Sequence, residues 1–375
     1  MFRTEFWASQ RVLLTGHTGF KGSWMTLWLE RLGAEVFGFA LPPDQTPNLY
    51  SYLEPFATLT SQFGDIRSRT ELKTFIAKAK PTVAIHMAAQ PLVRRSYAEP
   101  VETFATNTLG TAHVLDALRD APDLCATLVI TTDKVYENAE NGGAFAEDDP
   151  LGGHDPYSAS KAAAELVVRS YAQSFFEPAK RPVATARAGN VLGGGDWSED
   201  RLIPDIWRAA HTGRPVVLRY PQSTRPWQHV LDPLAGYLIF LERLVSEPRG
   251  TPRALNFGPS DPDGTMTVAQ VSNVITEGLG TTWIQADGPQ PAEMRHLALN
   301  AEKAMSSLSW RSRLDARQTL EWTLDWYRRF DAGENPRAIT VEQIERYESL
   351  ALEPRRVEAD PGTLAGNDIR ACVGY

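Results

Sequence analysis

The chain has 375 residues, of which 42% are hydrophobic and 22% are charged, an ordinary globular composition that predicts two domains. The formal net charge of -8 argues against a nucleic-acid-binding protein, and no apolar run is long enough to span a membrane. The N-terminus lacks a signal-peptide core, and the two cysteines, Cys125 and Cys372, form no disulfide or metal-binding pattern. We therefore expect a cytoplasmic protein without a metal ion.

The N-terminal segment has the pattern of a dinucleotide-binding unit. Residues 11–15 (RVLLT) predict a buried strand, the glycine-rich segment TGHTGFKG follows, and an amphipathic helical run ends at Gly33 before a second strand at 34–40. Such glycines permit a tight turn and a close approach of the backbone to a pyrophosphate, which the helix N-terminus then binds. We expect cofactor contacts from Gly16, His17, Thr18, Gly19, Phe20, Lys21 and Gly22.

The loop after the second strand bears on the choice between NAD and NADP. Asp44 comes late in the segment FGFALPPDQTP, so no acidic residue stands where a ribose hydroxyl is usually bound. The loop also lacks an arginine for a 2′-phosphate. The balance favours NAD and leaves NADP open.

Further strands are predicted at 82–89, 126–132 and 182–190, with helical runs between them. This alternation predicts an α/β fold with a Rossmann-type, doubly wound parallel sheet. Ligands bind such sheets at the carboxyl ends of the strands. The additional cofactor-binding residues that we predict are Asp65, Ile66, Ala88, Ala89, Gln90, Asn107 and Thr131.

Tyr157 and Lys161 lie four residues apart in the helical segment DPYSASKAAAELVVRSY, and therefore on one helix face. A lysine ammonium one turn away favours the phenolate and is expected to lower the tyrosine pKa. The pair then removes a hydroxyl proton as hydride leaves for a nicotinamide, so both residues are predicted to be catalytic and to contact the cofactor.

Four segments together, TGHTGFKG, HMAAQPLVRRSY, TTDKVYEN and DPYSASK, resemble the extended short-chain dehydrogenase/reductase family. Within that family they resemble the CDP-glucose 4,6-dehydratases, and the resemblance runs from about Arg11 to Trp326. The narrower resemblance depends on Thr132-Asp133-Lys134, because related dehydratases that act on dTDP-glucose carry Thr-Asp-Glu there and epimerases carry small or apolar residues.

The resemblance implies NAD-dependent dehydration of CDP-D-glucose to CDP-4-dehydro-6-deoxy-D-glucose, for deoxysugar and O-antigen biosynthesis. It implies that Thr132 orients the C4 hydroxyl, that Asp133 is the acid for the departing C6 hydroxyl, and that Lys134 is the base at C5 if its pKa is lowered. It also implies a second, smaller lobe that binds the nucleotide diphosphate.

Basic and aromatic residues in that lobe are candidates for substrate contacts, since guanidinium groups bind phosphates bidentately. Core packing is the favoured interpretation of Trp197 and Trp227, each taken singly. The predicted substrate-binding residues are Ser96, Asn190, Val191, Asp196, Trp197, Arg201, Arg225 and His229.

The expected domains are discontinuous. The Rossmann domain comprises residues 1–188 with returning segments at about 229–258 and 301–330, the substrate lobe comprises 189–228 and 259–300, and a C-terminal extension comprises 331–375. From about Ala332 the helical pattern ends, and Thr340 to Gln343 predict the capping box of a short helix, followed by a loosely ordered tail.

Three matters stay open at this level. By analogy with relatives, helices at 101–119 and 156–176 are candidates for the interface of a homo-oligomer, a dimer or a tetramer. A UDP-sugar 4-epimerase or decarboxylase would use the same Tyr157 and Lys161. A non-catalytic dinucleotide-binding sensor is the alternative of another class.

Overall fold

The computed structural model describes residues 3–138, 142–260, 265–288 and 296–350. The tail at 351–375, which includes Cys372 and most of the predicted extension, lies outside the described residues. Within the described part, no helix is long and apolar enough to cross a membrane.

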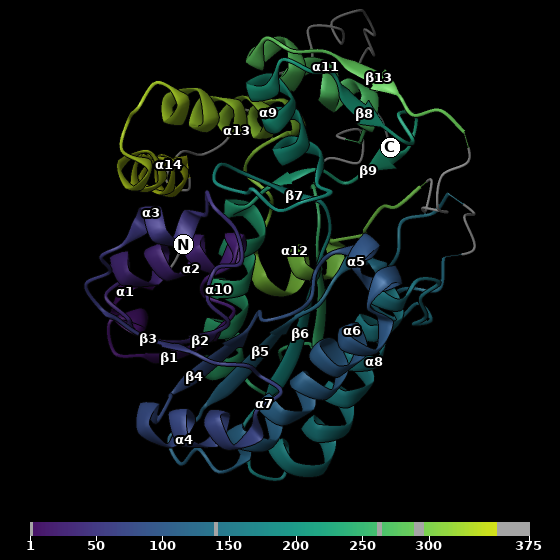
Figure 1. Ribbon diagram of the computed structural model, residues 1–375. Coiled ribbons are helices and arrows are strands. Elements are labelled where there is room, and N and C mark those ends of the chain that lie inside the picture. The colour runs from purple at the N-terminus through teal and green to yellow at the C-terminus, as the bar shows by residue number, and fades with distance from the viewer. Residues whose placement is uncertain (1–2, 139–141, 261–264, 289–295, 351–375) are drawn as a thin grey trace, which may run out of the picture.

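A seven-stranded parallel sheet forms the centre of the molecule, in the order β11-β6-β5-β4-β1-β2-β3 (Figure 1). The predicted doubly wound parallel sheet is confirmed. The strands are β1 (Arg11–Thr15), β2 (Glu35–Ala40), β3 (Leu59–Phe63), β4 (Val83–His86), β5 (Ala126–Ile130), β6 (Val183–Ala188) and β11 (Ala254–Phe257).

Each face of the sheet is covered by helices, so the strands are buried on both sides. In β1, Val12 and Leu14 belong to one apolar core and Leu13 to the other, as the two-residue period of a strand requires. The first core includes residues of α2 (Phe20–Arg31), α10 (Leu231–Ser246) and α12 (Glu302–Leu308). The second includes residues of α4 (Arg69–Ala79), α7 (Gly110–Arg119) and α8 (Pro156–Tyr171).

The helical run predicted from residue 101 is not one regular helix. It comprises α6 (Pro100–Phe104), a π-helical turn (Ala105–Leu109) and α7. The short helix α5 (Val93–Ala98) lies beside α6 and α8, whereas α1 (Thr4–Trp7) and α3 (Leu49–Leu53) contribute residues to the core on the α2 side of the sheet. The wider π turn contains Asn107, one of the predicted cofactor-binding residues.

A smaller layer lies beyond the carboxyl ends of the strands, at the top of Figure 1. It contains α9 (Leu202–Thr212), α11 (Val268–Leu279) and three two-stranded pairings. These pair β7 (Val191–Leu192) with β10 (Gln228–His229), β9 (Thr224–Arg225) with β12 (Met266–Thr267), and β8 (Val216–Leu218) with β13 (Trp283–Gln285).

The C-terminal helices differ from the sequence-based expectation. After α13 (Ala316–Asp331), α14 runs from Pro336 to Leu350, so the prediction of a helix capped by Thr340 is wrong. Asn335 accepts a hydrogen bond from the Ala338 N–H at 3.1 Å, while the Thr340 hydroxyl donates back to the Pro336 carbonyl inside the helix. Ile339 and Ile344 are fully buried, which makes α14 part of the core.

Candidate active site

The glycine-rich turn between β1 and α2 has the geometry that a dinucleotide requires. Gly16 has φ +79°, and a Cβ at Gly22 would lie 2.0 Å from the Gly16 carbonyl oxygen. Gly19 is the N-cap residue of α2 and provides no side-chain cap, so the first N–H groups of the helix are available to phosphate oxygens. These residues fit the pyrophosphate of a dinucleotide cofactor.

His17 and Thr18 of the same turn make contacts within the protein. The His17 ring is buried beside Gly38, and its Nε2 lies 2.7 Å from Ser61 Oγ. Burial lowers the pKa of His17 to about 4, so the imidazole is neutral near pH 7. Thr18 donates to the Leu41 carbonyl at 2.8 Å, and Phe20 packs against the core.

The other predicted cofactor residues follow neighbouring strands. After β4, Ala88 lies against Gly16, where a Cβ would meet the Ala88 nitrogen at 2.7 Å. The Gln90 N–H donates to Asn107 Oδ1 at 2.8 Å, and Asn107 Nδ2 donates to Ser160 Oγ of α8 at 2.9 Å. The π-helical turn thus connects the loop after β4, where Ala89 also lies, to α8.

Asp65 and Ile66 follow β3, the outermost strand on one side of the sheet. Asp65 accepts a hydrogen bond from the Arg67 N–H at 2.8 Å, and hydrogen bonds from Arg67 lower the pKa of the Asp65 carboxyl. Ile66 is buried against Gly110 of α7, where a Cβ would meet its Cδ1 at 2.6 Å. Ile66 therefore lies on the α7 side of the sheet.

Thr132, Asp133 and Lys134 form one compact turn directly after β5. Thr132 caps the 3₁₀ turn Asp133–Val135, and its Oγ accepts from the Lys134 N–H at 3.4 Å. The same hydroxyl donates to Asp133 Oδ1 at 3.0 Å. The short turn holds all three residues at the carboxyl end of β5.

Asp133 lies in a setting that favours its protonated form. Its carboxyl group is buried, and burial raises its pKa, although Lys134, Thr132 and Arg225 act in the opposite direction. Oδ2 is buried without a hydrogen-bond partner among the described residues. Burial and the unpartnered Oδ2 make this carboxyl group the candidate proton donor of the turn.

The environment of Tyr157 corrects one expectation. Burial raises the pKa of Tyr157 to about 12, and the negative charge of Asp133 raises it too. A hydrogen bond with Thr132 and the charge of Arg201 act in the opposite direction but are weaker than burial. The predicted lowering of the Tyr157 pKa by Lys161 is wrong for the protein without ligands, because removal from water dominates.

Lys161 lies one turn after Tyr157 on α8, and its Nζ donates to the Ile130 carbonyl at the end of β5 at 2.8 Å. Burial lowers its pKa to about 8, while Glu165 raises it. Lys21 of α2 is a second buried lysine with a lowered pKa. Burial lowers the pKa of Lys21 to about 7, and the charges of Arg201 and Lys161 lower it further. Lys21 thus lies close enough to Lys161 and Asp133 for their charges to influence its pKa.

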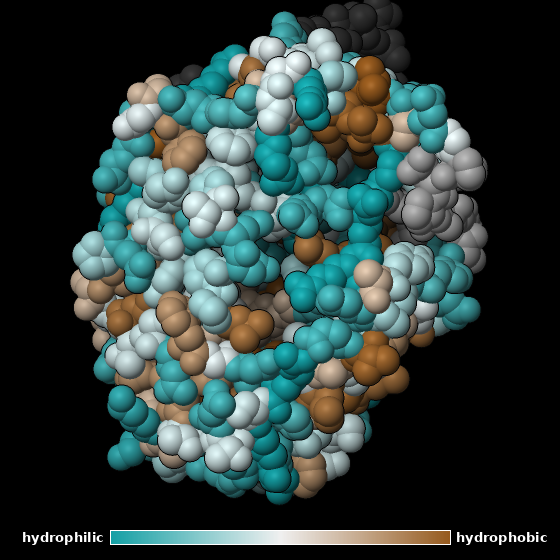
Figure 2. Space-filling model, viewed as in Figure 1, coloured by the Kyte–Doolittle hydropathy of each residue, from teal (hydrophilic) through white to brown (hydrophobic). Residues whose placement is uncertain are grey.

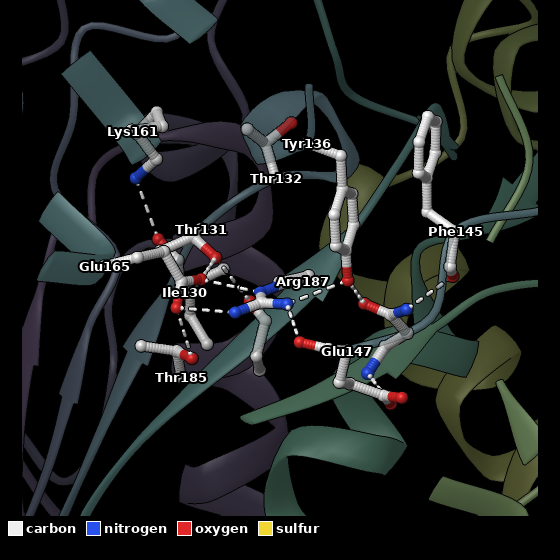
Figure 3. A network of polar contacts seen from close by, with 12 residues as sticks. Ile130, Thr131, Thr132, Tyr136, Phe145, Glu147, Lys161, Glu165, Thr185 and Arg187 are labelled. Carbon is white, nitrogen blue, oxygen red and sulfur yellow. Dashed lines mark hydrogen bonds and ion pairs between the residues drawn. The ribbon is translucent and has the colours of Figure 1, made fainter. Parts of the chain in front are cut away.

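A buried polar network lies directly beneath these groups (Figure 3). Glu165 of α8 and Arg187 of β6 form an ion pair, with Nε to Oε1 at 2.9 Å and Nη2 to Oε2 at 3.0 Å. Thr131, predicted to bind the cofactor, directs its hydroxyl to Glu165 at 2.6 Å. Glu165 and Arg187 were not among the residues predicted from the sequence, although the arginine inside the buried strand VATARA indicates a paired charge.

The predicted substrate residues are only partly brought together. Arg225 and Arg201 lie close enough to influence the pKa values of Asp133 and Tyr157, respectively. Arg201 Nη1 also lies 3.4 Å from Asp196 Oδ2. Other candidates lie on the surrounding elements, namely Ser96 on α5, Asn190 with φ +31° before β7, and Val191 in β7.

Two of the predicted substrate residues are core residues in the structure. His229 is fully buried, its ring lies edge-on between Trp24 and Trp322, and burial lowers its pKa to about 3. Trp197 is buried among Trp326 and other aromatic side chains. We correct both assignments to packing, because the side chains are only 0% and 3% exposed, respectively, and each ring packs against other aromatic side chains.

Comparison with known proteins agrees with this geometry. Residues 12–258 match the model of the NAD dependent epimerase/dehydratase family. A CDP-glucose 4,6-dehydratase of Salmonella typhimurium is 41% identical over 93% of this chain and 99% of its own length. A dTDP-glucose 4,6-dehydratase of Xanthomonas campestris is 28% identical over 84% of this chain and 92% of its own.

Solved structures show the same architecture. MoeE5 in complex with UDP-glucuronic acid and NAD is 26% identical, with a TM-score of 0.72 over 85% of this chain and 99% of that one. DesIV, a dTDP-glucose 4,6-dehydratase of Streptomyces venezuelae, has a TM-score of 0.74 over 87% of this chain and 99% of that one, at 23% identity, which supports the fold alone. The chain belongs to the NAD dependent epimerase/dehydratase family.

Proposed function

We propose that this protein catalyses the NAD-dependent dehydration of CDP-D-glucose to CDP-4-dehydro-6-deoxy-D-glucose. One observation carries the proposal: a buried carboxyl group whose pKa is raised, Asp133, lies in one turn with Lys134 and Thr132 and beside Tyr157. Elimination of water needs both an acid and a base at neighbouring carbons, and this turn supplies one of each. The 41% identity to a CDP-glucose 4,6-dehydratase over nearly the whole chain supports the same substrate.

Each group of the turn has a proposed task. Tyr157 takes the proton of the C4 hydroxyl, which Thr132 orients by a hydrogen bond. The resulting C4 ketone acidifies the C5–H bond, and Lys134 is the proposed base that takes that proton. Asp133 donates its proton to the C6 hydroxyl, which departs as water. Lys161 holds a positive charge one helix turn from Tyr157 and stabilises the phenolate as it forms in the reaction, although it does not bring the pKa of Tyr157 below its usual value in the protein without ligands.

The cofactor is proposed to be NAD, held by the turn at 16–22 and the loops after β3, β4 and β5. When bound, NAD would accept hydride from C4 and return it to C6, so that the reaction has no net redox change. The residues proposed to hold it are Gly16, His17, Thr18, Gly19, Phe20, Gly22, Asp65, Ile66, Ala88, Ala89, Gln90, Asn107, Thr131, Tyr157 and Lys161. The NAD dependent family and the absence of an arginine in the loop after β2 favour NAD over NADP.

The nucleotide diphosphate is proposed to bind between the sheet edge and the smaller layer, near Arg201 and Arg225. The Arg201 side chain is about one-third exposed, and its ion pair among the described residues is a long one, with Asp196 at 3.4 Å, so its guanidinium is available to a phosphate. Ser96, Asn190 and Val191 remain proposed neighbours. We place the reaction in the cytoplasm, where nucleotide sugars for deoxysugar biosynthesis are made.

A homo-oligomer through α6 and α8 is part of the proposal. Large apolar side chains are exposed on α6, on the π-helical turn after it and on α8, with exposed fractions of 81% for Val101, 53% for Leu109 and 56% for Leu166, respectively. Figure 2 shows several hydrophobic residues, in brown, on the surface of this region at the lower right. Light scattering should report a dimer or a tetramer for the native chain and a smaller species for Leu166→Glu. A native monomer would contradict this part of the proposal.

The activity is tested with purified protein, NAD and, in separate reactions, CDP-, UDP-, dTDP- and GDP-glucose. We expect the CDP-sugar to lose one water and form a 4-keto sugar, seen by mass spectrometry and by absorbance in alkali. Isomerisation of a UDP-sugar without loss of water would instead identify an epimerase. Binding of NAD without any turnover would favour a non-catalytic sensor.

A further inference from the structure

The carboxylate of Glu165 is completely engaged although it lies deep inside the protein. Its two oxygens accept four hydrogen bonds: two from Arg187, one from Thr131 at 2.6 Å and one from Thr185 at 2.8 Å. The side chains of the ion pair are 4% and 1% exposed. A buried ion pair contributes little net stability relative to apolar packing, because both charges are removed from water, so its retention calls for another reason.

Arg187 extends the network in the opposite direction. Its Nη1 donates to the Tyr136 hydroxyl at 2.8 Å and to the Glu147 carbonyl at 3.1 Å. The Tyr136 hydroxyl in turn donates to Asn256 Oδ1 of β11 at 2.6 Å. The planar guanidinium therefore fixes α8, β6 and the segment after β5 relative to one another.

The two ends of this network enclose the reactive turn. Thr131 immediately precedes Thr132, and Tyr136 follows Lys134 by two residues. Both side chains are bound, directly or through Arg187, to the carboxylate of Glu165, as Figure 3 shows. Thr131 and Tyr136 are therefore the two anchors of the turn. A shift of either residue would move the 3₁₀ turn at 132–134.

We propose that the Glu165–Arg187 ion pair is a positioning device that holds the turn 132–134 in its reactive place and keeps the ammonium of Lys161 charged. The catalytic role of the turn rests on the proposed function. The effect of the ion pair on the charge of Lys161 can be measured without turnover. Neither residue touches the reacting atoms in this assignment, so both are positioning residues.

The influence on Lys161 follows from the charges that surround it. Glu165 lies one turn further along α8 and raises the pKa of Lys161, opposing burial. The other titratable groups nearby are Tyr157 on the same helix, His86 at the end of β4 and Lys21 on α2. His86 is neutral because burial lowers its pKa to about 3, and Lys21 repels the ammonium. Glu165 is therefore the group that supports the charged state.

The first test compares two hydroxyls on the same carboxylate. Thr131→Val and Thr185→Val each remove one buried hydrogen bond to Glu165, but only Thr131 adjoins the reactive turn. We expect Thr131→Val to lower kcat on the order of 10- to 100-fold with KM for CDP-glucose unchanged, and Thr131→Ser to restore it. Thr185→Val should lower the melting temperature by about as much as Thr131→Val does, but its kcat should stay near that of the native enzyme. Equal losses of kcat in the two valine variants would overturn the positioning role.

The second test does not depend on the substrate. Lysine labelled with ¹³C at Cε reports the titration of Lys161 by NMR, and Lys161→Arg assigns its signal. Glu165→Gln should lower the pKa of Lys161 further below about 8, because a negative charge is lost and Arg187 is left unneutralised. Glu242→Gln, a buried carboxylate that binds Trp7 at 2.6 Å, is the control and should leave Lys161 unchanged.

The outcomes separate the inference from the proposed function. An unchanged Lys161 titration in Glu165→Gln would overturn the electrostatic part of the inference. If Glu165→Gln does not fold, Tyr136→Phe tests the other anchor and should reduce kcat as Thr131→Val does; native kcat there would contradict the inference. If native protein fails to dehydrate CDP-glucose, the proposed function is wrong, and the Lys161 titration alone decides the inference.

Discussion

The carboxyl group of Asp133 lies directly on the α-carbon of Gly189. A Cβ at Gly189 would come within 1.9 Å of Asp133 Oδ2 and 2.4 Å of its Cγ. Gly189 is the first residue after β6, the strand that pairs with β5, so this contact joins two neighbouring strand ends. The glycine is required by the space that the proposed acid occupies.

Gly189→Ala should therefore displace the Asp133 carboxyl group from its buried position. We expect kcat to fall on the order of 100-fold, because displacement of a catalytic group by about 1 Å has that effect. Steady-state kinetics with CDP-glucose measure it. Gly250→Ala is the control, since a Cβ there meets nothing within 4 Å, and it should retain native kcat. Full activity of Gly189→Ala would show that the position of Asp133 does not matter.

Asp133→Asn separates elimination from the preceding steps. The amide has the shape of the carboxyl group but cannot donate an acidic proton to the C6 hydroxyl. We expect loss of water to slow by roughly 10²- to 10⁴-fold, while exchange of the C5 hydrogen with deuterated solvent continues. Mass spectrometry of quenched reactions follows both. Parallel loss of exchange and elimination would argue against Asp133 as the acid.

Lys134→Met should have the complementary effect. The variant keeps an unbranched side chain but has no amine to take the C5 proton, so solvent exchange at C5 and loss of water should both fall by roughly 10²- to 10⁴-fold. The same labelled-solvent reaction measures it. Lys180→Met, remote from the turn, serves as the control. Exchange at the native rate in Lys134→Met would assign the base to another residue.

Asp232 predicts a distinct pH dependence of stability. Burial raises the pKa of this carboxyl group from 3.8 to about 7, although Tyr347 of α14 donates to it at 2.8 Å. The folded state therefore holds a proton that the unfolded chain releases between about pH 4 and pH 7. The contribution of Asp232 to the free energy of unfolding falls as the pH rises through this window and is lost above pH 7.

Asp232→Asn removes this titration. Relative to the native protein, its melting temperature should rise from pH 4.5 to about pH 7 and then stay level to pH 8, as scanning calorimetry would show. The buried histidines titrate alike in both proteins and cancel from the difference. A constant difference across this range would mean that Asp232 titrates at its ordinary pKa in the folded state.

Much of the fold follows from local sequence patterns. The alternation of short apolar runs with helical runs, and the glycines after β1, predict the parallel sheet and the dinucleotide turn because each is encoded within about 30 residues. The position of α14 does not follow in this way. Its buried residues contact segments far away in the chain, as Tyr347 does at Asp232, and its N-cap Asn335 lies before the segment that the pattern suggested.

The site shows the same division. The proximity of Tyr157 and Lys161, and of Thr132 to Lys134, follows from helix and turn spacing alone. The burial of a side chain does not follow from local spacing. His229 has the chemistry of a phosphate ligand, yet it packs between two tryptophans from distant helices. The pKa of Tyr157 depends on the same property, because removal from water outweighs the neighbouring charges.

The central claim is an internal dehydration with no net change in redox state, and one labelled substrate tests it most directly. CDP-glucose carrying deuterium at C4 should yield CDP-4-dehydro-6-deoxyglucose with that deuterium at C6, without accumulation of NADH, as NMR and mass spectrometry of the product would show. Deuterium that remains at C4 of an isomerised sugar, or that is recovered in free NADH, would contradict the account.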